Sequence, residues 1–263
     1  AIFDRKSNSL KRFTKENGLI SDMLRHIAVW DDEVWMATNS GLSIYNEKTR
    51  AILKVEGIGA PVQNLKALTI TSTDIWVGTL FNGIFRYNKL NKIWKNYSKN
   101  DGVPGNTVVG LKFDKNKLWV ASLDGEVGYF DINTNLWTKF SSAREGNISD
   151  KVKCITVYED YVFCGTFENG LYIYNKKLNL WKNLNKQNSA LTSDKITCLL
   201  INKNLLYIGT IGSGVSTYDI ISGKWNKLDK TNGLPSNDIT AIEAENNYIW
   251  FGTLDNGIGI LSI

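Results

Sequence analysis

The chain has 263 residues, 43% of them hydrophobic and 11% aromatic, so it is long enough to bury a substantial core and too apolar for a disordered chain. Its formal net charge is only +5, and the lysines are spread along the whole length. Because nucleic-acid binders concentrate positive charge on one surface, we expect no nucleic-acid partner.

Membrane insertion is also not expected, because no apolar run approaches the roughly 18 residues that a spanning helix needs. The first residues, AIFDRKSNSLKRF, lack the apolar centre of a signal peptide, so we expect any such peptide to be absent or already removed. Three cysteines, Cys154, Cys164 and Cys198, form no Cys-x-x-Cys pair and predict no disulfide framework.

One short motif, an aromatic residue followed by x-Gly-Thr or a close variant, recurs through the whole chain. Its copies begin at Trp35, Trp76, Trp119, Phe163, Tyr207 and Trp250. The spacings are 41, 43, 44, 44 and 43 residues, and a near-constant period of this length is the signature of a repeat architecture.

The elements within each repeat follow one order, seen clearly in the fourth copy. An apolar run at 152–157 is followed by a polar turn, the Phe163 motif, a third run at 170–174 and a Trp-led run at 181–184. These runs are rich in aromatic and β-branched residues and are bounded by Gly, Asn and Asp, which predicts short strands. No segment has a sustained helical period.

Four short antiparallel strands in about 43 residues are typical of one blade of a β-propeller. We therefore predict an all-β fold, a six-bladed β-propeller that forms a single domain over residues 1–263. The predicted blades cover about residues 23–56, 64–98, 107–141, 151–185, 195–229 and 238–263.

The last repeat lacks its fourth strand, and the N-terminus supplies a match for it. Residues 10–19 align without gaps on residues 94–103, which hold the fourth strand of the second repeat. We expect residues 10–14 to complete the sixth blade and so remove an open sheet edge.

Residues 232–258 contain Asn-Gly-Leu-Pro-Ser-Asn, then Ile239, Ile242, Ile249-Trp250, Gly252-Thr253 and Gly257-Ile258. This pattern resembles the two-component regulator propeller repeat, and residues 101–106 are a second, fair copy. The resemblance covers essentially the whole chain. It implies a sensor-type propeller located in the periplasm or outside the cell, often one that recognises carbohydrates. This sequence departs from the family in holding six repeats, where longer arrays are more usual, and no kinase domain.

Candidate ligand-binding residues lie on the innermost strand of several blades. In the aligned repeats, Arg25, Lys66 and Lys153 share one column, and innermost strands line the channel of a propeller. Converging cations focus a positive potential, which favours a carboxylate, a phosphate or an acidic sugar. The alternative is that these long side chains only extend into solvent.

The loop after each Gly-Thr motif varies most between repeats, and such loops usually carry function. Its aromatic and acidic members are Phe81, Asp124, Phe167, Glu168 and Asp255. These residue types suit a sugar or a partner protein, and they suit packing against a neighbouring blade equally well.

His26 is the single histidine, and it replaces a small residue in the column next to the three cations. It is interpreted as an interior or channel-facing side chain, or as a further ligand-binding residue. The alternative is a lyase or hydrolase that uses His26 with a carboxylate or hydroxyl partner. We predict no catalytic residue, no metal site and no cofactor, because one histidine cannot build a His-rich metal site.

Two structural expectations complete the interpretation. Eight of the nine tryptophans recur at fixed repeat positions, which favours packing between blades over sugar stacking. The cysteines belong to the strands, where we expect buried, unreactive thiols. The predicted function is a non-catalytic module that binds a small molecule or carbohydrate, and the alternative is a scaffold for a partner protein.

Overall fold

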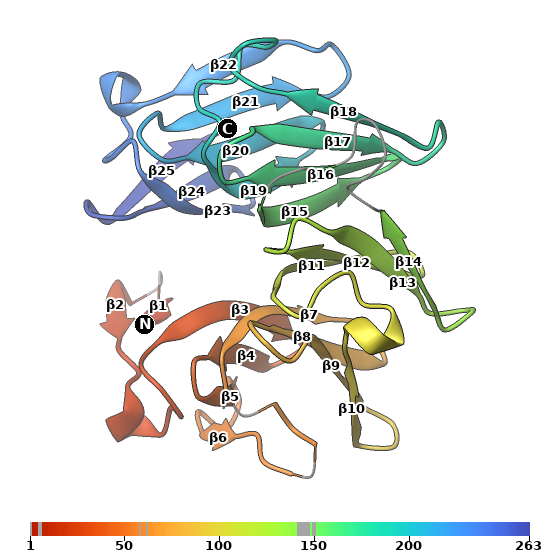
Figure 1. Cartoon of the computed structure of the whole chain (residues 1–263). Helices are drawn as coiled ribbons and strands as arrows, with labels where there is room; N and C mark the ends of the chain where they lie inside the picture. The colour runs from red at the N-terminus through yellow and green to blue at the C-terminus, as the bar shows by residue number, and fades with distance from the viewer. Residues whose placement is uncertain (1, 5–6, 58, 62, 141–147, 149–150) are drawn as a thin grey trace. The chain divides into compact units, whose positions relative to one another are not determined.

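The computed structural model describes residues 2–4, 7–57, 59–61, 63–140, 148 and 151–263, and these form short antiparallel sheets joined by tight turns (Figure 1). The chain divides into two compact units, Ala1–Phe113 and Asp114–Ile263, with the division in the first strand of the third blade.

Unit 1 holds a two-stranded sheet, the first two blades and the first strand of the third. Its strands are β1 (Ile2–Asp4), β2 (Ser9–Lys11), β3 (Leu24–Trp30), β4 (Glu33–Thr38), β5 (Gly41–Asn46), β6 (Ile52–Lys54), β7 (Leu65–Ile70), β8 (Asp74–Thr79), β9 (Ile84–Asn88), β10 (Ile93–Tyr97) and β11 (Val108–Asp114). Two 3-10 turns, η1 (Lys15–Asn17) and η2 (Lys99–Asp101), precede β3 and β11.

Unit 2 holds the rest of the third blade and blades four to six. Its strands are β12 (Lys117–Ser122), β13 (Val127–Asp131), β14 (Leu136–Phe140), β15 (Val152–Tyr158), β16 (Tyr161–Thr166), β17 (Leu171–Asn175), β18 (Leu180–Leu184), β19 (Ile196–Asn202), β20 (Leu205–Thr210), β21 (Val215–Asp219), β22 (Trp225–Leu228), β23 (Ile239–Glu245), β24 (Tyr248–Thr253) and β25 (Ile258–Ser262). A third 3-10 turn, η3 (Lys230–Asn232), precedes β23.

The predicted fold class is confirmed: the chain is an all-β six-bladed β-propeller whose blades mostly have four antiparallel strands in sequence order. The described strands of the six blades fall within the predicted ranges, whereas residue 141, the predicted end of the third blade, lies outside the described residues.

The N-terminal segment differs in detail from the expectation. β2 pairs with β1, with Leu10 opposite Phe3, and the sixth sheet is three-stranded. Closure of that sheet by residues 10–14 would join the two units and stays a prediction. One contact within unit 1 supports it. The Phe13 ring lies 4.9 Å from the ring of Tyr45 in the first blade. Phe140 holds the repeat position equivalent to Phe13, and its ring likewise lies 4.7 Å from the ring of Tyr174 in the next blade.

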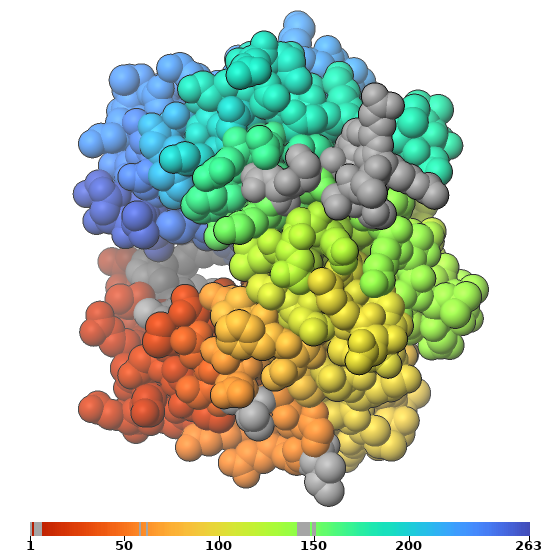
Figure 2. Space-filling model, viewed as in Figure 1, coloured from red at the N-terminus to blue at the C-terminus, as the bar shows by residue number. Residues whose placement is uncertain are grey.

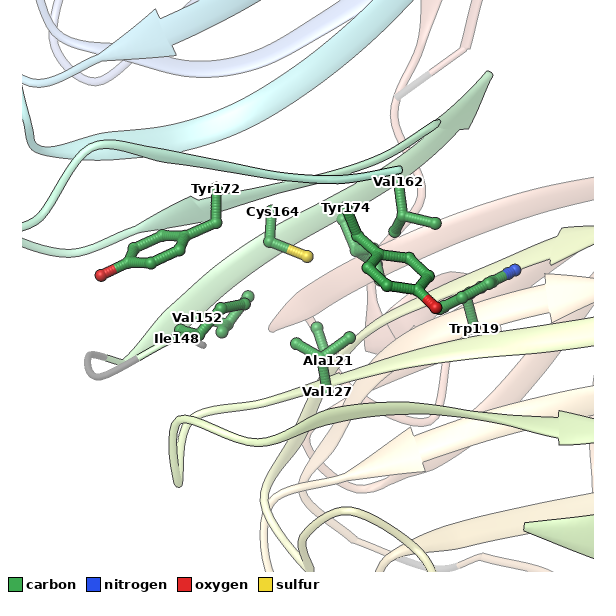
Figure 3. Close-up of a cluster of buried hydrophobic side chains, with 10 residues drawn as sticks. Trp119, Ala121, Val127, Ile148, Val152, Val162, Cys164, Tyr172 and Tyr174 are labelled. Carbon is green, nitrogen blue, oxygen red and sulfur yellow. The ribbon is translucent and has the colours of Figure 1, made fainter. Parts of the chain in front are cut away.

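The core lies between neighbouring blades. In unit 2, Figure 3 shows Trp119 of β12 beside Tyr174 of β17, and Trp119 is 1% exposed. Its ring lies 6.0 Å from those of Phe140 and Tyr174. The prediction that the second-strand tryptophans pack between blades is confirmed here. On the face drawn in Figure 2, side chains fill much of the space between adjacent ribbons within each unit.

The fourth-strand tryptophans also pack on an aromatic residue of the third strand of their own blade, and the Trp181 ring in addition lies 5.8 Å from that of Phe140 in the third blade. The pairs are Tyr87 with Trp94, Phe130 with Trp137, Tyr174 with Trp181 and Tyr218 with Trp225, with centroid distances of 5.0, 5.0, 5.1 and 4.7 Å. Aromatic pairs in this range contribute about 0.5–1.5 kcal/mol beyond area burial. They hold the outermost strand of these four blades on its sheet.

The Asn-Gly-Leu-Pro loop at 232–235 has a structural explanation. Gly233 has φ 108°, a left-handed conformation that glycine adopts without the penalty of a side chain. The Asn232 Oδ1 accepts the Asp229 N–H at 2.6 Å, and the Asn237 Oδ1 accepts the Lys230 N–H at 2.9 Å. Leu234 is buried in the adjoining core. The same bonds recur around η1 and η2, so this motif builds the link between blades.

Candidate functional site

The column that holds the three predicted cations is a line of β-bulges. In five blades the first strand carries one residue more than its partner strand at this position, and the extra residues are Arg25, Lys66, Lys153, Thr197 and Thr240. A bulge bends the strand and redirects one side chain, and bulges are over-represented beside functional sites. The candidate site is therefore built on a repeated backbone feature.

In unit 1, the bulge side chain of Arg25 reaches the loop after the Thr38 motif. Its Nε donates to the Asn39 Oδ1 at 2.7 Å, and the side chain is exposed. Lys66 occupies the same place on β7 and is half-buried. Phe81, in the loop between β8 and β9, is 66% exposed and does not fold into the core. The loop and the bulge of the first blade thus share one end of the blade.

Hydroxyl groups keep these loops in shape. The Thr79 Oγ1 donates to the Gly83 carbonyl at 3.0 Å and accepts the Asn82 N–H at 2.9 Å. Thr166 and Thr253 make the same two bonds in unit 2. The threonine of each Gly-Thr motif therefore supports the loop that follows it.

His26 follows the bulge of β3 and stands opposite Ala37. Its side chain is exposed at the surface, yet desolvation by surrounding atoms lowers its pKa, and the positive charge of Lys112 on β11 lowers it further. His26 is therefore neutral at pH 7. The strands β3 and β7 contain no acidic residue.

A catalytic role for His26 would need a hydrogen-bonded carboxylate or hydroxyl partner. Among the residues that the structure describes, neither group bonds to its side chain, and the backbone of Ile27 is its hydrogen-bond partner. The same residues contain no group of three or more His, Cys, Asp or Glu side chains arranged to hold a metal ion.

In unit 2, the bulge cation lies over an aromatic loop residue. The Lys153 Nζ is 5.2 Å from the ring centroid of Phe167, which is 44% exposed. A cation over an exposed ring contributes about 0.5–1 kcal/mol. Asp124, Glu168 and Asp255 are exposed in the corresponding loops of three blades. The structure therefore brings Lys153 and Phe167 together.

The bulge residues of the last two blades serve the backbone instead. The Thr197 Oγ1 donates to the carbonyl of Gly209 at 3.0 Å and lies 2.6 Å from that of Ile239 in the next blade. The Thr240 Oγ1 donates to the Gly252 carbonyl at 3.2 Å. Only part of the column therefore carries charge.

The cysteines are free thiols, as predicted, with Cys164 fully buried and Cys154 and Cys198 partly buried. Burial raises the pKa of Cys154 and Cys164 well above the ordinary range, and it raises that of Cys198 to about 11. Because the thiolate is the reactive form, these thiols are unreactive at neutral pH.

Sequence reasoning missed Asn39 and Lys112 as parts of the basic surface of unit 1. Asn39 carried a signal, because it directly follows the Thr38 motif as Phe167 follows Thr166. No sequence signal pointed to the influence of Lys112 on His26, because that influence depends on where β11 lies in space.

The fold and these bulges define the class of protein: a β-propeller with its variable loops and bulge side chains at one end of each blade. No family model matches the chain, and no curated protein matches its sequence. In the described part of the chain, no helix has the length and apolar character of a membrane span.

Solved structures share the fold at low sequence identity. The extracellular domain of the putative hybrid two-component system BT3049 from B. thetaiotaomicron matches with a TM-score of 0.76 and 20% identity, over 98% of this chain and 35% of that one. That of the putative one-component system BT4673 from the same organism matches with a TM-score of 0.75 and 21% identity, over 93% and 33%.

PorZ, a surface component of the type-IX secretion system of Porphyromonas gingivalis, matches with a TM-score of 0.69 and 16% identity, over 89% of this chain and 38% of that one. The chain thus spans about a third of the length of these three solved chains. At such identities the likeness is one of fold.

Proposed function

We propose that this protein is a non-catalytic ligand-binding module of the sensor type that acts outside the cytoplasm, and that its ligand is an anionic small molecule or an acidic sugar. The location and the sensor role rest on the extracellular B. thetaiotaomicron domains and on the repeat motif. The site is the basic surface of unit 1, defined as Arg25, His26, Lys66 and Lys112.

The observation that carries the proposal is the placement of two cations on neighbouring bulges. Arg25 and Lys66 stand at the same repeat position of β3 and β7, strands without acidic residues. Thr197 and Thr240 show that blade packing does not require charge at this position. The guanidinium and ammonium groups therefore serve recognition, and a carboxylate or phosphate is their complement.

His26 and Asn39 refine the expected ligand. A neutral imidazole offers one donor and one acceptor, which suits a hydroxyl group beside the anionic group. The Asn39 Oδ1 accepts from the Arg25 Nε and so orients the guanidinium. A hydroxylated carboxylate, such as a sugar acid, satisfies both kinds of group.

Melting curves test this assignment. We would compare glucuronate, phosphate and neutral glucose at constant ionic strength, using the wild-type protein, the Arg25→Gln/Lys66→Gln variant and a Lys54→Gln/Lys92→Gln control that removes equal charge elsewhere in unit 1. A ligand at 100 times its dissociation constant stabilises the native state by about 2.7 kcal/mol.

We expect an anion to raise the melting temperature of the wild type and the control, and not that of the Arg25→Gln/Lys66→Gln variant. A shift that the variant retains would refute the assignment of the site. Absence of any shift would favour the alternative, a scaffold for a partner protein.

A further inference from the structure

Unit 2 contains a second candidate site, away from the bulges, on β16, β17 and β18 of the fourth blade and β21 of the fifth, strands that Figure 1 labels. A cavity of about 360 Å³ opens between these two blades. Its size falls in the range of small-molecule pockets. None of the residues of the basic surface lines it.

The cavity exists because side chains here are smaller than at the preceding interface. Between the third and fourth blades, the Trp119 ring lies 4.9 Å from that of Tyr129, and the Lys176 Nζ lies 5.9 Å from the Trp119 ring. Figure 3 shows Trp119 and Tyr174 filling this space. Between the fourth and fifth blades, the positions equivalent to Trp119, Tyr129 and Lys176 hold Phe163, Ile173 and Ile220, respectively. Phe163 and Ile173 are smaller than Trp119 and Tyr129, and Ile220 lacks the ammonium group that Lys176 places beside the Trp119 ring, so the second interface is left open.

The cavity walls are mostly apolar and offer flat surfaces. The aromatic rings of its walls are Tyr161, Phe163 and Tyr218, and its aliphatic members are Ile173, Leu178, Leu180 and Ile220. Leu178 and Leu180 are 66% and 63% exposed, which is a large apolar area to leave in water. A planar ring of a ligand would cover these surfaces and gain the offset or edge-to-face packing that aromatic rings prefer.

The polar groups at the cavity select the charge of that ligand. The Asn175 Oδ1 already accepts the N–H groups of Lys177 and Leu178, so its amide nitrogen remains the available group. Lys182 contributes the only charge in the lining, and no carboxylate lines the cavity. The amide nitrogen of Asn175 and the ammonium group of Lys182 are therefore the donors at the cavity, and the local charge is positive.

We propose that this cavity binds a small aromatic carboxylate, with its ring between the aromatic walls and its carboxylate toward the donors of Asn175 and Lys182. This site goes beyond the proposed function, because it has different residues and a different ligand chemistry from the basic surface. The fit combines apolar burial, which gives affinity, with charge complementarity, which separates acids from neutral rings.

Isothermal titration with benzoate tests the proposal, with benzyl alcohol as the neutral ring and acetate as the acid without a ring. We expect benzoate to bind wild-type protein with a dissociation constant of about 1 mM or below, benzyl alcohol to bind at least about tenfold more weakly, and acetate not to bind. Failure of benzoate to bind would overturn the proposal.

Two variants copy residues of the preceding interface. Ile173→Tyr introduces the residue type that the third blade has at the equivalent position, Tyr129, and is expected to fill the cavity and abolish binding. Lys182→Thr introduces the residue type of the equivalent Thr138 and is expected to weaken the binding of benzoate about tenfold and to leave the binding of benzyl alcohol unchanged. The control Lys139→Thr removes a lysine from the fourth strand of the third blade and should change neither affinity.

Three results would count against the site. They are unchanged benzoate binding in a folded Ile173→Tyr protein, equal weakening of both ligands by Lys182→Thr, and loss of benzoate binding in the Arg25→Gln/Lys66→Gln variant. The last result would place benzoate on the basic surface, so the failure of this proposal and of the proposed function are distinguishable.

Discussion

The tight approach of neighbouring blades at the Gly-Thr motif leads to a sharp prediction for Gly165. A Cβ atom added there would lie 2.4 Å from the Ile196 Cγ2 and 2.7 Å from the Cys154 Sγ, against 3.4 Å or more for ordinary contact. Both neighbours belong to packed strands, so the first would have to move by about 1 Å. The Gly165→Ala variant therefore overpacks the interface between the fourth and fifth blades.

The expected cost follows from two opposing effects. Overpacking a well-packed core costs about 1–3 kcal/mol, and alanine recovers about 0.4–1 kcal/mol by restricting the unfolded chain. We therefore expect Gly165→Ala to lower the free energy of unfolding by about 1–2 kcal/mol. This corresponds to a melting temperature lower by about 2–8 °C for a protein of this size.

Urea unfolding followed by tryptophan fluorescence provides the measurement, and Gly252→Ala provides the matched variant. Gly252 holds the same repeat position in the sixth blade, but an added Cβ would find its nearest neighbour, the Ala241 Cβ, at 3.4 Å. An unchanged or increased stability of Gly165→Ala would refute the packing argument. If Gly252→Ala were equally costly, the face of the sixth blade would be covered in solution, as the predicted closure by the N-terminal segment requires.

Three further outcomes are expected. Asp74 is fully buried and bonded to Arg86 at 2.8 and 3.0 Å. Desolvation alone would raise the pKa of Asp74, but these hydrogen bonds and others lower it. Because Asp74→Ala leaves the Arg86 charge without its buried partner, we expect the variant to lose about 3–5 kcal/mol of unfolding free energy, measured in urea. A loss below about 1 kcal/mol would contradict this. Hydrogen bonds from Thr231, followed by the Lys227 ammonium, lower the pKa of Asp229 to about 2. Its stabilising contribution is therefore complete above pH 4 and lost as the pH falls toward 2, and the stability difference between wild type and Asp229→Asn should shrink over that range. Deleting residues 1–13 should lower the melting temperature more than exposed termini usually do, because the deletion removes Phe13 from Tyr45; an unchanged melting temperature would argue against a closing strand.

The repeat period, the strand-and-turn pattern and the recurring tryptophans were enough to predict the fold. Each blade is a local unit, so the apolar alternation within about 43 residues already determines its four strands. The same locality explains why Trp119 and Cys164 were correctly assigned to strands that pack between blades. The column of Arg25, Lys66 and Lys153 was also visible, because aligned repeats bring equivalent positions together.

Tertiary structure alone decided what those positions do. Whether the column forms a bulge depends on the hydrogen-bond register between two strands, and no single residue in it specifies that register. The partners of Arg25 and Lys153 lie 14 residues further along the chain and were found only once the strands were paired. The cavity between the fourth and fifth blades depends on side-chain volumes from separate repeats, such as Ile173 and Ile220, and their fit is a property of the packed interface.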